Sequence, residues 1–162
     1  MGAKAVTSVG ADDKLEFVRK LGAEDAVNRK KENPAVLFGR HEINAVLDCV
    51  GGAVLGESIG KMAVGGRWIL VSTLGGETAE IPLRPILKRA ITLKGSTLRS
   101  RTNEKKAQIL ADLERVIWPA FESGRIRPVI QKILPIRQAE EAHELLRAGH
   151  GIGKIVLTVG KA

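Results

Sequence analysis

The stretch Ile43-Asn44-Ala45-Val46-Leu47-Asp48-Cys49-Val50 decides the fold, because it is a nearly continuous run of apolar residues. A strand of a parallel sheet is covered on both faces and has such a run, whereas a strand with one wet face alternates apolar and polar residues. Gly51 and Gly52 follow directly and indicate a turn at the end of the strand. We therefore expect a strand of a parallel sheet here, with Cys49 buried in it.

The segment before this run predicts a strand, a turn and a helix. Ala3–Val9 is short and apolar, Gly10–Asp13 offers a turn and a helix N-cap, and Lys14–Leu21 has apolar residues at helical spacing. We expect a second short strand at Ala26–Asn28, and then a weak helix near Pro34.

The segment after the run continues the alternation of strands and helices. The expected elements are a helix over Val54–Val64, strands over Arg67–Thr73 and Ala90–Thr97, and a long amphipathic helix over Asn103–Phe121. The loop between the two strands holds Gly75-Gly76 and two prolines. Such alternation predicts an α/β fold with a doubly wound parallel sheet.

The C-terminal part predicts a strand, a helix and a strand. These elements are expected at Arg127–Leu134, Gln138–Ala148 and Gly153–Val159. Nowhere in the chain is there the fingerprint G-x-G-x-x-G/A, which follows the first strand of a dinucleotide-binding sheet. We therefore expect an incomplete Rossmann-like sheet that lacks its first strand, which is central in the order 3-2-1-4-5-6.

Composition excludes several classes of protein. The chain has 162 residues, of which 44% are hydrophobic and 27% charged, as in a globular domain. No apolar run approaches the roughly 20 residues that span a bilayer, and no leader is recognised, so we expect a cytoplasmic protein without a membrane partner. Cys49 is the single cysteine, so a cysteine-based metal site is not expected.

The net charge of +8 indicates a surface that attracts anions. Nucleic acids and phosphorylated cofactors both meet this description. The aromatic content is only 3%, and the aromatic residues are scattered rather than interleaved with Lys and Arg. Because single-stranded nucleic acid is bound on aromatic stacking platforms, we expect no nucleic-acid partner.

Five stretches of the chain recur in a known family in this order and spacing: Gly22-Ala23, Leu47-Asp48-Cys49-Val50-Gly51-Gly52, Gly66-Arg67-Trp68, Gly95-Ser96-Thr97-Leu98-Arg99-Ser100-Arg101, and Gly153-Lys154-Ile155-Val156-Leu157. Together they resemble the zinc-free NADPH:quinone oxidoreductases of the medium-chain dehydrogenase/reductase superfamily. The resemblance implies hydride transfer from NADP(H) to a quinone or activated carbonyl compound by a homo-oligomer. It also implies that residues 1–123 form a partial dinucleotide-binding domain and that residues 124–162 return to the catalytic domain.

The resemblance implies a site for the adenosine 2′-phosphate at Gly10, Ala11 and Lys14. Arg29 would pair with the same phosphate or stack on the adenine. The residues themselves agree in part, since no carboxylate stands at the end of the first strand to bind a ribose diol. The alternative is that the charged residues of this turn only cap and solvate a helix.

The ends of the later strands are implied to contact the rest of the cofactor. These positions are Val50, Gly51, Gly52, Ser72, Thr73, Leu74, Gly75, Gly95, Ser96 and Thr97. Ordinary turn chemistry is the alternative for the same residues. No catalytic residue is assigned, because hydride transfer can proceed by positioning alone, with protons from solvent. We expect the isolated chain to be weakly active or inactive, and a non-catalytic interaction or regulatory fragment remains the alternative.

Overall fold

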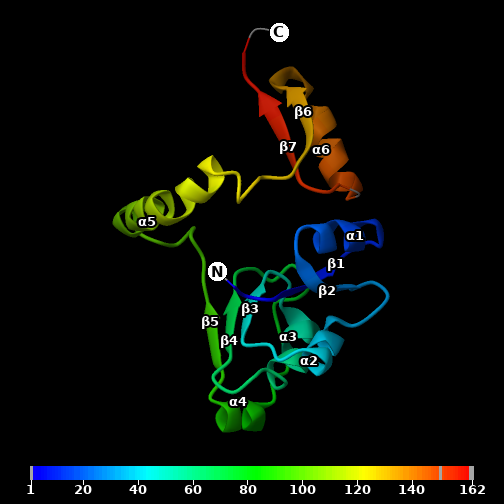
Figure 1. Ribbon diagram of the computed structural model, residues 1–162, viewed down its shortest axis with the longest axis vertical. Coiled ribbons are helices and arrows are strands. Elements are labelled where there is room, and N and C mark those ends of the chain that lie inside the picture. The colour runs from blue at the N-terminus through cyan, green and yellow to red at the C-terminus, as the bar shows by residue number, and fades with distance from the viewer. Residues whose placement is uncertain (1, 150, 161–162) are drawn as a thin grey trace. The chain divides into compact units, whose positions relative to one another are not determined.

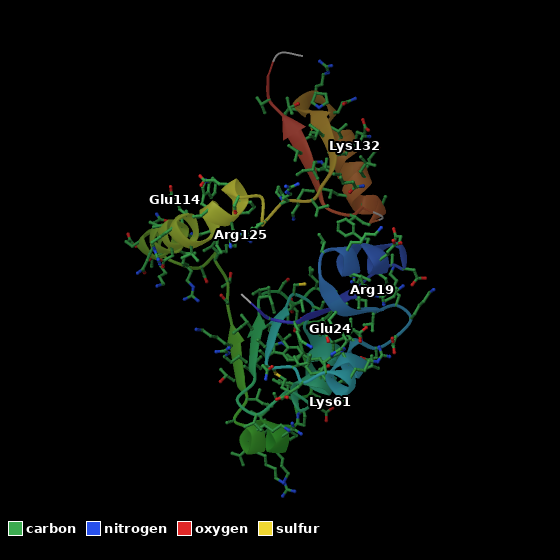
Figure 2. All side chains as sticks on the ribbon, viewed as in Figure 1. Arg19, Glu24, Lys61, Glu114, Arg125 and Lys132 are labelled. Carbon is green, nitrogen blue, oxygen red and sulfur yellow. The ribbon has the colours of Figure 1, made fainter. Side chains whose placement is uncertain are left out.

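The computed structural model describes residues 2–149 and 151–160. Contacts divide the chain into two compact units, Met1–Arg101 and Thr102–Ala162 (Figure 1). Charged side chains such as Lys61, Glu114 and Lys132 extend into solvent from the surfaces of both units (Figure 2). None of the helices in the described part of the chain is long and apolar enough to span a membrane.

The first unit alternates strands with helices. Its elements are β1 (Ala5–Val9), α1 (Asp13–Lys20), β2 (Ala23–Asn28), the 3-10 turn η1 (Pro34–Val36), α2 (Leu37–Arg40), β3 (Ala45–Asp48), α3 (Gly52–Ile59), β4 (Arg67–Leu70), α4 (Leu83–Arg89) and β5 (Thr92–Gly95). β1 pairs with β2, and β4 lies between β3 and β5. All three pairings are parallel, which confirms the predicted α/β fold with a parallel sheet.

The two sheets of this unit present unpaired edges to one shared cavity. Among the described residues, β1 pairs only with β2 and β3 only with β4. Residues Ala5–Ser8 and Ala45–Val50 line the same cavity of about 430 Å³. The cavity therefore lies where the strand order 3-2-1-4-5-6 places the first strand.

The open edge explains why the expected burial of β3 is wrong. Leu47 is 78% exposed, and Cys49 is exposed as well. The apolar run predicts the sheet correctly, but burial on both faces also requires neighbouring elements, and β3 has a neighbouring strand on one side only in the described chain.

The hydrophobic core of the first unit forms between α3 and the β3-β4-β5 sheet. Leu55, Ile59, Met62, Trp68 and Ile91 are buried there together. The ring of Trp68 stacks on that of Phe38, with 5.8 Å between centroids and 11° between planes. Aromatic pairs of this kind add to the stabilisation from burial.

The helix α4 (Leu83–Arg89) was not predicted from the sequence, because two prolines stand at its start. The loop predicted between β4 and β5 contains α4, with Pro82 at its N-cap position and Pro85 in its first turn. Proline is tolerated there because the first N–H groups of a helix have no partner within the helix. The helix ends at Arg89, and Ala90 follows as its C-cap with a left-handed φ of 50°.

Element boundaries also differ from the expected ones. α3 ends at Ile59 instead of Val64, since Gly60 follows as its C-cap. β4 and β5 end at Leu70 and Gly95, so the residues after them lie in turns.

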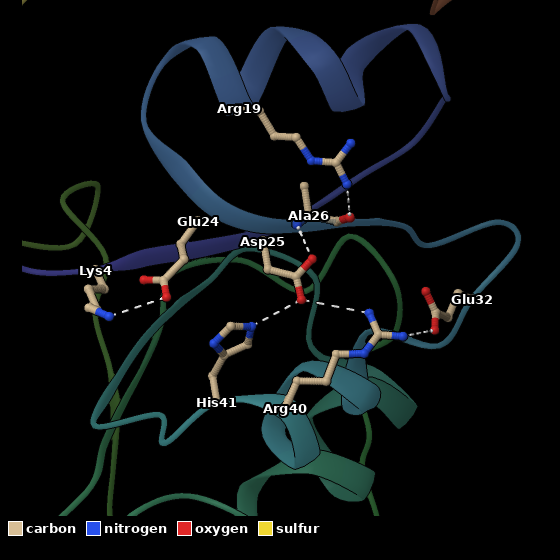
Figure 3. A network of polar contacts seen from close by, with 8 residues as sticks. All are labelled: Lys4, Arg19, Glu24, Asp25, Ala26, Glu32, Arg40 and His41. Atoms are coloured by element: carbon tan, nitrogen blue, oxygen red, sulfur yellow. Dashed lines mark hydrogen bonds and ion pairs between the residues drawn. The ribbon is translucent and has the colours of Figure 1, made fainter.

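β2 begins at Ala23, three residues earlier than expected, because its backbone pairs with β1 from Ala5 onward. The polar residues of this first part of β2 join a surface network (Figure 3). Asp25 accepts a hydrogen bond from its neighbour Ala26 N at 2.8 Å and contacts His41 Nε2 at 3.0 Å. Arg40 lies 3.7 Å from the same carboxylate and 2.5 Å from Glu32. The hydrogen bond with His41 is the main cause that lowers the pKa of Asp25 below its ordinary 3.8.

The second unit contains one long helix and a strand-helix-strand segment. Its elements are α5 (Asn103–Glu122), β6 (Ile130–Pro135), the 3-10 turn η2 (Ile136–Gln138), α6 (Ala139–Ala148) and β7 (Lys154–Thr158). Thr102 caps α5, since its hydroxyl accepts from Lys105 N at 3.3 Å. β6 and β7 pair in parallel, which confirms the predicted C-terminal strand-helix-strand segment.

A pair of Leu→Ala variants tests the assigned core. Leu55 in α3 is 4% exposed and Leu87 in α4 is 84% exposed. We expect Leu55→Ala to lower the free energy of unfolding by about 2–5 kcal/mol, because it leaves a cavity. Leu87→Ala should change it by less than about 0.5 kcal/mol. Urea unfolding followed by circular dichroism measures both, and equal losses would contradict this core.

The lowered pKa of Asp25 predicts a pH-dependent contribution to stability. A carboxylate with a lowered folded pKa stabilises the fold above its unfolded pKa, and this stabilisation is lost as the pH falls through the folded pKa. The difference in urea midpoint between wild type and Asp25→Asn should therefore be largest near neutral pH and shrink well below pH 3.8. Glu24→Gln is the control, because Glu24 contacts Lys4 at the surface. A difference that grows in acid would refute the role of Asp25.

Candidate functional site

The carboxyl ends of β1 and β2 meet at Gly10 and Arg29. Arg29 N donates to Val9 O at 2.9 Å, which continues the pairing of the two strands by one residue. The guanidinium of Arg29 lies against Gly10, where a Cβ would stand 2.9 Å from Nη2. The absence of a side chain at position 10 therefore makes room for this guanidinium. Ala11, the next residue, is half-buried.

Arg29 is an exposed cation beside two hollows of the surface. It lines the 430 Å³ cavity, and it also lines a hollow of about 310 Å³ between the residues after β2 and the start of α3. Lys30 and Lys31 line the second hollow. In the described part of the chain no carboxylate forms an ion pair with Arg29. Its planar fork of N–H donors suits a phosphate.

Asp12 stands before α1, yet its side chain does not cap that helix. One carboxylate oxygen accepts from Asn28 Nδ2 at 2.7 Å, and the other pairs with Lys31 Nζ. These hydrogen bonds, from Asn28 first and then from Lys31, lower the pKa of Asp12. The carboxylate therefore ties the first turn to the end of β2. Lys14, in the first turn of α1, is half-buried.

The turns after β3 and β4 are in backbone contact. Gly51 and Gly76 form an isolated parallel bridge, and Gly75 N donates to Val50 O at 2.7 Å. Gly52 has a φ of +59°, and a Cβ on it would stand 2.9 Å from Gly75 O. Both the left-handed conformation and the close approach require glycine at position 52.

The remaining predicted residues follow β4 and β5 at the same edge. Ser72 and Thr73 come after β4, and Leu74 N donates to Cys49 O at 3.4 Å. Gly95 ends β5, and Ser96 N donates to Leu70 O at 2.9 Å. Because β3, β4 and β5 are parallel, all these turns, with Thr97, lie at the carboxyl edge of one sheet.

The structure therefore brings the predicted site residues together in three groups. Gly10, Ala11 and Arg29 stand at the end of the β1-β2 sheet. The turns from Val50 to Gly52 and from Ser72 to Gly75 form a second group, and the turn from Gly95 to Thr97 is a third on the same sheet edge. Arg29, after β2, and Val50, after β3, both line the 430 Å³ cavity, so this cavity borders the ends of both sheets.

Sequence reasoning missed Asp48 as a residue of this edge. Its carboxylate accepts hydrogen bonds from the backbone N–H groups of Val50 and Gly51. An aspartate that precedes a glycine turn is the local signal for such a bond, because Asp side chains bond the backbone two residues on. Asp48 stands within an apolar run, which predicts a strand and gives no indication of a side chain that bonds the following turn.

Residues 21–157 match the family described as zinc-binding dehydrogenase. The chain belongs to this family. Quinone oxidoreductase-like protein 2 of Bos taurus is 25% identical over 161 residues, which are 97% of the chain and 46% of that protein. A quinone oxidoreductase of Lama guanicoe is 28% identical over 159 residues, which are 95% and 46%. These relatives confirm the predicted resemblance to the quinone oxidoreductases of the medium-chain dehydrogenase/reductase superfamily.

One solved structure has the same fold as this chain. The quinone oxidoreductase of Thermus thermophilus, solved alone and with NADPH, superposes with a TM-score of 0.78 at 25% identity. The match covers 98% of the chain and 50% of that structure. The chain thus spans about half the length of the relatives it matches. The relatives named here are quinone oxidoreductases or a quinone oxidoreductase-like protein, and one of them has been solved with NADPH bound.

The described residues of the chain do not fit the zinc ion in the family's name. No group of three or more His, Cys, Asp or Glu side chains gathers there in a way that could hold a metal ion. His41 instead contacts Asp25, and Cys49 is the single cysteine. Protein zinc sites need three or four such ligands.

Two Gly→Ala variants separate close approach from backbone strain. Gly52 and Gly65 have φ values of +59° and +73°, but nothing lies within 4 Å of a Cβ on Gly65. Gly65→Ala should cost about 1–2 kcal/mol of unfolding free energy from strain alone. Gly52→Ala should cost clearly more, because its Cβ meets the Gly75 carbonyl. Urea unfolding checks this, and equal losses would show that the two turns are not in contact.

Proposed function

We propose that this chain carries the NADPH-binding part of a zinc-free, quinone reductase-like oxidoreductase. The observation that carries the proposal is the guanidinium of Arg29, held over Gly10 at the end of β2. A helix start and strand ends at the carboxyl edge of a parallel sheet are where such folds bind dinucleotides. The relatives, all oxidoreductases by name, support the same class of activity.

The charges at the β1-β2 end support the choice of NADPH over NADH. A ribose diol is bound by a carboxylate, whereas a 2′-phosphate is bound by cations. Both oxygens of Asp12 already accept hydrogen bonds, from Asn28 and Lys31. Arg29 would pair with the phosphate, and Gly10, Ala11 and Lys14 would surround it.

The glycine turns would receive the remainder of the cofactor. Gly75 and the turn from Gly95 to Thr97 are exposed at the sheet edge, whereas Gly51 and Gly52 are buried against the turn at Gly75 and Gly76. Bound NADPH would supply hydride chemistry, and a quinone or activated carbonyl compound would accept the hydride. The chain's own part is to bind and orient, so we assign no acid or base to it.

Several properties of the whole protein belong to this proposal. We place residues 1–123 in the cofactor domain and residues 124–162 in a segment that returns to the catalytic domain. A homo-oligomer in the cytoplasm agrees with the family resemblance and the composition. Since the chain spans about half of its relatives, we expect weak turnover or none from this chain alone.

Calorimetric titration with NADPH and with NADH tests the proposal. The wild-type chain should bind NADPH more tightly than NADH. Arg29→Gln should weaken NADPH binding about tenfold or more, because a charge-assisted hydrogen bond to phosphate is lost, and it should leave NADH binding nearly unchanged. Arg84→Gln, on the exposed surface of α4, is the matched control and should change neither affinity.

A folded chain that binds neither nucleotide would refute the proposed function. A non-catalytic interaction fragment would then be the better interpretation. The open edges of β1 and β3 in the described chain favour that second candidate, because unpaired strand edges pair readily with strands of other chains.

A further inference from the structure

Asp48 ends β3 and is buried, with 6% of its surface exposed. Its carboxylate accepts three hydrogen bonds. Oδ1 accepts from Val50 N at 2.8 Å and from Gly51 N at 3.1 Å, and Oδ2 accepts from Trp68 Nε1 at 3.0 Å. No ion pair in the described ranges, 2–149 and 151–160, includes Asp48. The carboxylate is therefore held by neutral N–H donors alone, which offset the cost of its burial.

Trp68 is a fixed point for this carboxylate. Its side chain is 2% exposed, belongs to the core cluster and stacks on Phe38. Side chains packed in this way hold one rotamer, so the indole N–H points in a set direction. Asp48 consequently connects the turn at Val50–Gly51 to the buried core of the first unit.

The turn at Val50–Gly51 is bonded through its backbone to the turn at Leu74–Gly76. Gly75 N donates to Val50 O, Leu74 N donates to Cys49 O, and Gly51 bridges Gly76. Any shift of the backbone at Val50 or Gly51 must therefore be followed at Leu74–Gly76. The two turns move as one body with Asp48 at its base.

We propose that Asp48 is a positioning residue, which fixes both glycine turns against Trp68 and so sets the shape of the cofactor-facing edge. The inference rests on the proposed function where it says that these turns receive the cofactor. Asp48 is buried under the turn, so its effect on binding is indirect.

The substitution Asp48→Asn has a definite expected effect. An Asn oxygen still accepts from Val50 and Gly51, but the amide NH₂ then faces the indole N–H of Trp68, donor against donor. We expect amide hydrogen exchange at Val50, Gly51 and Gly75 of the ligand-free chain to become about tenfold faster. The dissociation constant for NADPH should rise by about the same factor.

A second substitution distinguishes this geometry from a general loss of stability. Trp68→Phe removes the opposing donor and keeps a ring beside Phe38. The double variant Asp48→Asn/Trp68→Phe should therefore exchange more slowly at Val50 and Gly51 than Asp48→Asn alone. Asp112→Asn, an exposed position in α5, makes the same chemical change and should leave the exchange rates unaltered.

The exchange measurement separates this inference from the proposed function. Faster exchange with rescue in the double variant supports the positioning role, even if the wild-type chain fails to bind NADPH, which would refute only the function. Exchange at the wild-type rate in Asp48→Asn, or no rescue, would overturn the inference. If Asp48→Asn does not fold, Trp68→Phe alone decides: faster exchange at Val50 and Gly51 supports the role, and unchanged exchange overturns it.

Discussion

Backbone contact between two turns is the constraint on which the candidate site depends. β3 and β4 are parallel neighbours, so their carboxyl ends lie at one edge and the turns after them meet there. The bridge from Gly51 to Gly76 brings two main chains closer than side chains would permit, since a Cβ on Gly52 would press on the Gly75 carbonyl. The glycine doublets at 51–52 and 75–76 are therefore requirements of this contact. Trp68, in the core beside α3, holds the first of these turns in place through its hydrogen bond to Asp48.

Most of the fold could be predicted from the sequence because its signals are local. The apolar run before Asp48 and the helical spacing in α1 and α5 act over one element at a time, and both kinds of element were found. α4 was missed because two prolines argue against a helix unless they occupy its first turn. The first residues of β2 were missed because Glu24 and Asp25 are polar, and they belong to a strand because their backbone pairs with β1, which the local sequence does not reveal.

The part of the candidate site that was predictable is the set of turns after parallel strands. Parallel strands place all their carboxyl ends on one edge, so Gly51, Ser72 and Ser96 could be assigned together without knowledge of any contact. The role of Asp48 and the exposure of Leu47 and Cys49 could not, because each depends on elements distant in sequence. The exposure of Leu47 and Cys49 depends on whether a second strand lies beside β3. The third hydrogen bond to Asp48 comes from Trp68, twenty residues further along the chain.

The edges of β1 and β3 that stay unpaired among the described residues have a consequence for work with the chain in concentrated solution. β1 reads Ala-Val-Thr-Ser-Val and β3 reads Ala-Val-Leu-Asp, and neither contains the lysine or proline that guards many edge strands. Asp48, the one charge among these residues, is turned inward. We therefore expect chains to pair through these edges and to precipitate during purification, with a steep dependence on protein concentration. A gatekeeper lysine placed at an exposed edge position such as Leu47 is the corresponding remedy.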